Sequence, residues 1–197
     1  MSKEKAQKGR REEIIRAALA AYGEKGIYNT RIEEVAAAAG IGKGTVYEYF
    51  RSKEELLSAA IRFEMEESAG QVRENAAKES TVRGKLKAIV ETVMLRRREN
   101  CYQTLDMSLV NMGGSMKDLQ SLVVEQNALW QGWLEEIIDM GVTRGEIRRV
   151  DARVCLGAVM GAILYLVQPL GNSPWDDLSP GEAAQRVTDF FFEGIGK

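Results

Sequence analysis

The sequence predicts an all-α protein of about nine helices, and three observations lead to this prediction. The three prolines, Pro169, Pro174 and Pro180, lie near the C-terminus, so nothing in the first 168 residues forbids a helix. Apolar residues recur at helical spacing, and no window alternates apolar and polar residues as a half-buried strand does. Capping residues and glycines then divide the chain into separate helices.

Four closely spaced helices are predicted up to residue 72. Gly26 can adopt the left-handed conformation that ends the first helix. Thr30 with Glu33 forms a capping box for the second, and Ser52 with Glu55 forms one for the fourth. The predicted spans are about Gly9–Lys25, Arg31–Ala38 and Lys43–Phe50, followed by a helix from Ser52 to about Val72.

Five longer helices are predicted in the remainder of the chain. Gly141 is expected to end the seventh helix, Asp151 to cap the eighth, and Ser179 with Glu182 to cap the last. Their predicted spans are about Thr81–Arg98, Tyr102–Met112, Ser115–Met140, Asp151–Gln168 and Ser179–Gly194.

The amino-acid composition excludes several classes of catalytic and metal-binding protein. The chain of 197 residues contains no histidine, which excludes histidine-based catalytic triads and metal sites with histidine ligands. Cys101 and Cys155 form no CxxC pair, so reduced thiols are favoured over a disulfide scaffold or a four-cysteine metal site. We therefore expect no cofactor, no metal and no catalytic residue. An enzyme that relies on Asp, Glu or Lys is the remaining enzymatic alternative.

The ends of the chain and its most apolar stretch indicate a cytoplasmic protein that does not contact a membrane. The N-terminus is charged and lacks the apolar core of a secretion signal. The longest uncharged apolar run, Val154–Val167, is shorter than the roughly 18 residues that a bilayer span needs, so we expect a buried helix there.

The segment between the second and third helices is typical of a helix-turn-helix, whose second helix enters the major groove of DNA. Ala39–Gly42 would form the turn, and Lys43-Gly44-Thr45 would begin the recognition helix, where a glycine allows the backbone to approach DNA closely. A phosphate-binding P-loop is excluded, because Gly44 separates the lysine from the threonine and no strand precedes the segment. Tyr47 and Tyr49 are two positions apart, so at least one of them should point outward.

Three stretches, Val35–Ile41, Gly44–Phe50 and Lys53–Leu57, together with Thr30 at a helix start, form a pattern more specific than a bare helix-turn-helix. Over residues 10 to 60 this pattern resembles the TetR family of bacterial transcriptional regulators. The resemblance implies three partners: double-stranded operator DNA, a small-molecule inducer and a second copy of the chain. Carried over by position, the DNA contacts are Thr30, Lys43, Gly44, Thr45, Tyr47, Tyr49 and Lys53, with Tyr49 standing where a histidine is frequent in the family.

The resemblance and the pattern of helices predict two domains. Residues 1–60 form the DNA-binding domain, in which 1–9 are a basic arm expected to be disordered, and 61–197 form the ligand-binding and dimerisation domain. Methionines and aromatic residues in the second domain suit an adaptable, mostly apolar pocket, although an ordinary helical core explains each of them better individually. The candidate ligand contacts are Met94, Tyr102, Asp106, Met107, Trp130 and Trp133.

The last two helices are predicted to hold a homodimer. Val154–Val167 is apolar around its whole circumference, and small residues four apart allow a second helix to approach closely. The alternative is a central helix enclosed by its own chain. The candidate interface residues are Gly157, Ala158, Gly161, Ala162, Val187 and Phe191.

The sequence thus predicts a ligand-responsive DNA-binding regulator, in particular a repressor that a small, mostly apolar inducer releases from its operator. The alternative is a helical bundle that binds a small molecule and has no DNA function.

Overall fold

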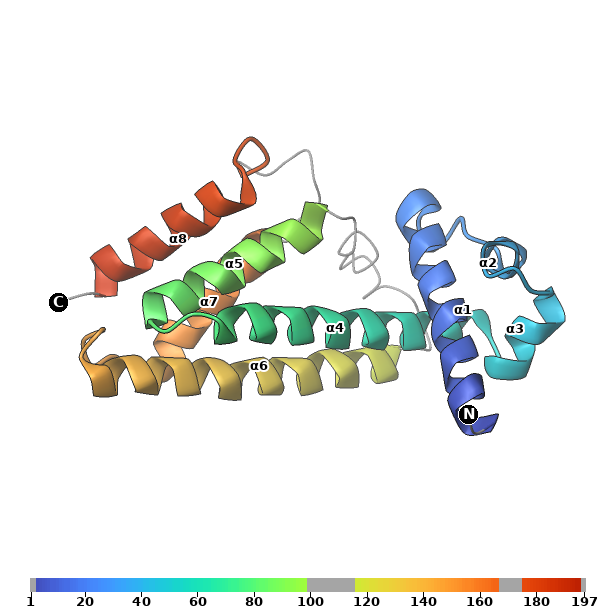
Figure 1. Ribbon diagram of the computed structural model, residues 1–197, viewed down its shortest axis with the longest axis horizontal. Coiled ribbons are helices and arrows are strands. Elements are labelled where there is room, and N and C mark those ends of the chain that lie inside the picture. The colour runs from blue at the N-terminus through green and yellow to red at the C-terminus, as the bar shows by residue number, and fades with distance from the viewer. Residues whose placement is uncertain (1–2, 99–115, 167–174, 196–197) are drawn as a thin grey trace. The chain divides into compact units, whose positions relative to one another are not determined.

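The computed structural model describes residues 3–98, 116–166 and 175–195, which form eight helices and no strand (Figure 1). The prediction of an all-α fold is confirmed, and the predicted helix at Tyr102–Met112 lies outside the described residues. None of the described helices is long and apolar enough to span a membrane. The helices are α1 Lys3–Lys25, α2 Ile32–Ala38, α3 Lys43–Tyr49, α4 Lys53–Ala77, α5 Val82–Arg98, α6 Met116–Arg144, α7 Ala152–Leu166 and α8 Pro180–Ile195.

The chain divides into two compact units, and α4 contributes to both. We call Met1–Glu66 with Gln103–Ser121 the N-terminal unit, and Glu67–Tyr102 with Leu122–Lys197 the C-terminal unit. The N-terminal unit holds α1, α2, α3, the first part of α4 and the first residues of α6. The C-terminal unit holds the rest of α4 with α5, α7, α8 and most of α6.

One apolar face of each helix builds the core of the N-terminal unit. α1 contributes a stripe at helical spacing, α2 and α3 add short apolar faces, and the start of α4 closes the cluster. Its most buried members include Ile14, Ala18, Tyr22, Val35, Val46, Phe50, Leu56 and Ala60. This core fixes the directions of the two short helices, which are too short to be stable alone.

The beginning of α1 corrects the prediction of a disordered arm at 1–9, because the helix already starts at Lys3. No proline precedes Gly9, and the basic side chains that follow contact the fold. Arg10 pairs with Glu13 at 2.7 Å, and the guanidinium of Arg11 lies 4.8 Å from the centre of the Phe50 ring. These contacts support a helix where charge alone suggested a solvated tail.

The core of the C-terminal unit is formed by α4 to α8, with α5 and α8 running side by side (Figure 1). Fully buried side chains come from α4, α5, α6 and α8, and include Val72, Ile89, Met94, Leu134 and Ala183. Capping agrees with the sequence at α8, where the Ser179 hydroxyl accepts from the Glu182 N–H at 3.2 Å and the Glu182 carboxylate accepts from the Ser179 N–H at 2.9 Å.

The end of α6 differs from the prediction, since Gly141 lies inside the helix. A Cβ at Gly141 would come within 2.8 Å of Val82, so this glycine allows close packing and does not end the helix. The left-handed residue is Gly145, with φ +71°, one position after α6 ends at Arg144.

The buried phenol of Tyr22 predicts a loss of stability at high pH. Its hydroxyl has no hydrogen-bond partner among the described residues. Burial, helped by the charge of Glu54, raises the pKa of Tyr22 to about 12. A raised pKa contributes stability that is complete below the pKa of the unfolded chain, near 10, and is lost as pH rises toward the folded value. Two pKa units correspond to about 2.7 kcal/mol.

We therefore expect Tyr22→Phe to match the wild type or exceed its stability at pH 7, and to lose less unfolding free energy between about pH 10 and pH 12. Urea unfolding across this range measures the difference, with the exposed Tyr28→Phe as a control. Parallel losses in the wild type and Tyr22→Phe would contradict the assignment.

Candidate functional site

The helix α3 is attached to the N-terminal unit by few side chains. Val46 is the buried residue within it, and Phe50, which caps its C-terminal end, is also buried. The turn before it contains Gly40 in the left-handed region, with φ +65°, and the Ile41 N–H donates to the Ala36 carbonyl at 3.0 Å. Lys43, Gly44, Tyr47 and Glu48 of α3 are exposed.

The outward face of α3 carries most of the predicted DNA contacts. Lys43, Gly44 and Tyr47 are exposed, with Tyr47 at 44%, and Thr45 is half-buried. Tyr49 is half-buried against the core, so the expectation that one of the two tyrosines points outward is confirmed. A Cβ at Gly44 would meet no atom within 4 Å, so packing within the chain does not require glycine there.

Lys43 is held by a carboxylate that the sequence reasoning missed. Its ammonium lies 2.6 Å from the Glu33 carboxylate of α2 and 5.9 Å from the centre of the Tyr47 ring. The hydrogen bond between them lowers the pKa of Glu33 and raises the pKa of Lys43. Ten residues separate the two along the chain, so no local spacing signals the pair.

Thr30 corrects a prediction, because it neither caps α2 nor offers its hydroxyl to solvent. The residue is 1% exposed, and its Oγ1 donates within the core toward the carbonyls of Gly26 at 2.8 Å and Ala21 at 3.1 Å. The N-cap is Arg31, whose N–H donates to the Glu34 carboxylate at 2.8 Å. A threonine hydroxyl can bond backward to the carbonyl four residues earlier, and here that option is taken.

Lys53 begins α4 beside the start of α2. Its ammonium donates to the Thr30 carbonyl at 2.6 Å, which uses one of its three N–H donors. Ser52 caps the helix as predicted, since its hydroxyl accepts from the Glu55 N–H at 3.2 Å. The Glu55 carboxylate accepts from the Arg51 N–H at 2.8 Å.

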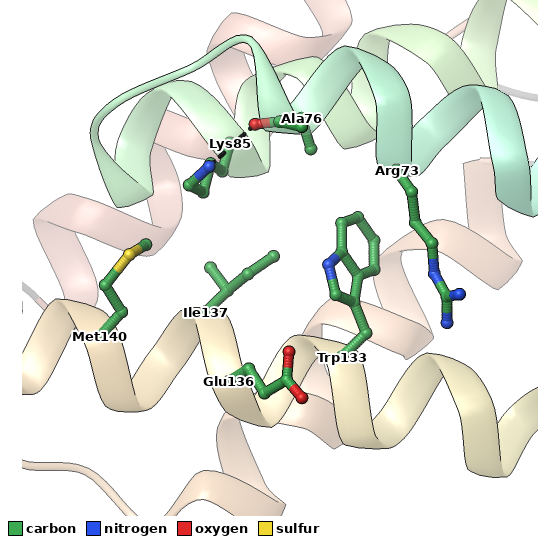
Figure 2. A pocket seen from close by; sticks show the side chains of 8 residues that line it. Arg73, Ala76, Lys85, Trp133, Glu136, Ile137 and Met140 are labelled. Carbon is green, nitrogen blue, oxygen red and sulfur yellow. Dashed lines mark hydrogen bonds between the residues drawn. The ribbon is translucent and has the colours of Figure 1, made fainter.

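The C-terminal unit contains a pocket between α4, α5 and α6, shown in Figure 2, with a volume of about 210 Å³. Trp133 is the one predicted ligand contact that lines it. Arg73 lies with its guanidinium 5.8 Å from the centre of the Trp133 ring, and the Lys85 ammonium donates to the Ala76 carbonyl at 3.0 Å. The lining residues are Arg73, Ala76, Ala77, Lys85, Trp133, Glu136, Ile137 and Met140.

Two of the other predicted ligand contacts, Met94 and Trp130, are described and do not line this pocket. Met94 is fully buried in the core, and Trp130 packs edge-on to Trp133 with ring centres 5.6 Å apart. Tyr102, Asp106 and Met107 lie outside the described residues. Arg73 and Lys85 carried no sequence signal, because they belong to different helices and line one pocket only in the folded unit.

The predicted dimer residues fall into two groups. On α7, Gly157, Ala158 and Gly161 are exposed and Ala162 is partly buried. On α8, Val187 and Phe191 are buried in the core of their own chain, which corrects their assignment to an outer face. The exposed residue of α8 is Phe190, at 74%, because neighbouring positions on a helix point about 100° apart. Val154 and Tyr165 are further exposed apolar residues on α7.

Comparison with known proteins agrees with this geometry. Residues 14–60 match the family described as "Bacterial regulatory proteins, tetR family". The HTH-type transcriptional repressor KstR2 of Rhodococcus jostii is 28% identical over 71% of this chain and 70% of its own length. The fatty acid metabolism regulator protein of Bacillus subtilis is 24% identical over 77% of this chain and 78% of its own length.

Among solved structures, the regulator FadR from Bacillus subtilis in complex with stearoyl-CoA has a TM-score of 0.72 at 20% identity and covers 93% of this chain and 98% of its own. AibR in complex with isovaleryl coenzyme A and operator DNA has a TM-score of 0.67 at 21% identity, with coverages of 92% and 97%. The shared fold extends beyond the matched N-terminal segment. Residues 14–60 belong to the TetR family of bacterial regulatory proteins, and the chain as a whole is similar to regulators of that family.

Proposed function

We propose that this regulator acts in the cytoplasm as a homodimeric repressor, which binds operator DNA through α3 and leaves it when a small ligand binds the C-terminal unit. The observation that carries the proposal is the outward face of α3. That face exposes a lysine, a tyrosine and a glycine with open space around it, while the helix buries Val46 alone. A recognition helix in the major groove needs such a face.

The structure supports separate roles for the predicted DNA contacts. Lys43, Gly44, Thr45 and Tyr47 would meet the groove, with Lys43 exchanging the Glu33 carboxylate for a phosphate or a base edge. Lys53 keeps two N–H donors for a phosphate while its third holds the Thr30 carbonyl. Thr30 and Tyr49, which face the core, would position α2 and α3.

The exposed apolar faces of α7 and α8 support the dimer. Val154, Gly157, Ala158, Gly161 and Tyr165 follow the spacing of one helical face, and all are exposed in the single chain. Phe190 adds an exposed aromatic ring on α8. Two such helices from each subunit can form a four-helix bundle with twofold symmetry. A dimer also places two recognition helices for half-sites about 34 Å apart.

Release would depend on α4, which contributes to both units, as does α6. A ligand that binds more tightly to the conformation unable to bind DNA lowers the affinity for the operator. A difference of about 1.4 kcal/mol between its binding free energies for the two conformations lowers that affinity tenfold. The solved relatives that hold stearoyl-CoA and isovaleryl coenzyme A support a ligand with an apolar acyl part.

The first prediction of the proposed function tests the DNA-binding face of α3. Gly44→Ala should leave the unfolding temperature unchanged or raise it, since Gly in a helix costs up to about 1 kcal/mol against Ala. The same change should weaken operator binding by about tenfold or more if the backbone must approach DNA. Operators are first identified by genomic footprinting, and affinity is then measured by titration of labelled duplex.

Gly70→Ala is the matched control, because Gly70 is an exposed helical glycine with the same open surroundings. Both variants should gain stability, and only Gly44→Ala should lose affinity. Equal affinities would remove α3 from the interface, and a wild-type protein that binds no duplex at low salt would favour the bundle without DNA function.

The second prediction concerns the carboxylate beside Lys43. Glu33→Gln should raise affinity for every duplex by about two- to fivefold, because Lys43 no longer has to leave a partner before it meets a phosphate. The slope of affinity against salt should also become steeper. Binding titrations at several salt concentrations measure both effects.

Two comparisons separate this mechanism from a general loss of negative charge. Glu48→Gln removes the same charge from the exposed surface of α3 and should change affinity less. In a Lys43→Ala background, the gain from Glu33→Gln should largely disappear. A gain of the same size without Lys43 would show that the pair is not its source.

The third prediction addresses the dimer. Sedimentation equilibrium at micromolar concentration should give a mass about twice the 21.9 kDa of one chain. Gly161→Leu should shift the protein to monomers, because the added side chain occupies a face where helices approach closely. Gly132→Leu, at an exposed glycine of α6, is the control and should remain dimeric. A wild-type mass of one chain would contradict the dimer.

A further inference from the structure

We propose that the pocket between α4, α5 and α6 binds a small organic anion whose apolar body lies on α6 and whose anionic group meets Arg73, while Lys85 adds positive charge to the lining. All of its lining residues belong to the C-terminal unit. Binding at this pocket does not depend on the DNA interaction proposed above, so either proposal can fail without the other.

The apolar side of the pocket comes mainly from one helix. Figure 2 shows Trp133, Ile137 and Met140 rising from α6 toward the cavity. Trp133 and Met140 are partly buried and so leave apolar surface for a ligand to cover, whereas Ile137 is buried in the core. A cavity of about 150 Å³ holds one benzene ring. The 210 Å³ of this pocket suits a somewhat larger body, such as two fused rings or a short branched chain.

Two cations from two different helices also line the pocket, and in the view of Figure 2 Trp133 lies between their charged groups. Arg73 comes from α4, and its guanidinium lies over the Trp133 ring. The ring contacts the flat face of the guanidinium, so the N–H groups at the edge of the guanidinium stay available to a hydrogen-bond acceptor. Lys85 comes from α5, and its bond to the Ala76 carbonyl uses one of its three N–H donors. Neither cation has an ion-pair partner among the described residues.

Charge selects the class of ligand. The lining holds two cations and one carboxylate, Glu136, so a ligand with a single negative charge would neutralise the excess. A cationic ligand would meet repulsion from Arg73 and Lys85, and a neutral one would leave their donors facing an apolar body. A carboxylate, a sulfonate or a phosphate ester on an apolar body shares the required chemistry.

The test uses naphthoate as the probe and its neutral amide, naphthamide, as the matched control, with the full-length protein in a calorimetric titration. We expect naphthoate to bind at least about tenfold more tightly than naphthamide, since hydrogen bonds to charged groups are the stronger ones. Naphthyl phosphate in place of naphthoate then distinguishes a preference for phosphate from one for carboxylate, and tighter binding of either anion supports the site.

Three exposed or half-buried positions locate the binding. Arg73→Gln should weaken naphthoate by about three- to tenfold while leaving naphthamide unchanged. Glu136→Gln should strengthen naphthoate by about two- to threefold, because it removes the carboxylate from the lining. Lys87→Gln removes a lysine of α5 that does not line the pocket and should have no effect.

Arg73 and Glu136 are exposed, so these variants should fold as the wild type does, which thermal unfolding verifies. Equal binding of naphthoate and naphthamide would overturn the proposal. So would wild-type affinity in both Arg73→Gln and Glu136→Gln, or the absence of measurable binding at millimolar naphthoate.

Discussion

The apolar core that α1, α2, α3 and the start of α4 share fixes the geometry of the N-terminal unit, and the hydrogen bond from the Lys53 ammonium to the Thr30 carbonyl adds a polar link between the starts of α4 and α2. Thr30 is itself fixed, because its hydroxyl is bound to the carbonyls of Gly26 and Ala21 in the core. The helix α3 lies between these two helices in sequence and buries only Val46. Its direction is therefore set by its neighbours, and a helix of seven residues with one buried side chain could not set it alone.

The same arrangement explains how one helix can serve two activities. α4 begins at Lys53 in the N-terminal unit and carries Arg73, a lining residue of the pocket, in the C-terminal unit. An unbroken run of backbone hydrogen bonds makes such a helix respond as a single element. A ligand that displaces one part of α4 would therefore act on the contact at its first turn, without a chain of side chains to carry the signal.

Features determined by neighbouring residues could be predicted from the sequence, whereas features determined by distant packing could not. The caps at Ser52 and Ser179 depend on residues three positions away and were predicted correctly. The predicted roles of Thr30 as a helix cap and of Gly141 as a helix end are wrong, because threonine and glycine each occur in two structural roles. A threonine can bond forward or backward, and a glycine can end a helix or allow close packing. On α8, helical spacing separates Phe190 from Phe191 but does not say which faces the core. Arg73 and Lys85 come from different helices, so the pocket that both of them line could not be predicted from the sequence.

The ion pair between Lys43 and Glu33 also affects how quickly the protein can find its target. A genome offers roughly a million or more non-specific sites for each correct one, and every lysine that contacts phosphate lengthens the stay at each of them. A carboxylate that competes for Lys43 shortens those stays, since the lysine returns to Glu33 when base contacts are absent. The affinity lost by separating Lys43 from Glu33 is the same for every sequence, and only the correct operator makes enough base contacts to compensate for it. The ratio of specific to non-specific affinity would then stay the same, and the gain would be a faster search, with shorter dwell times during sliding set by an acidic residue on α2.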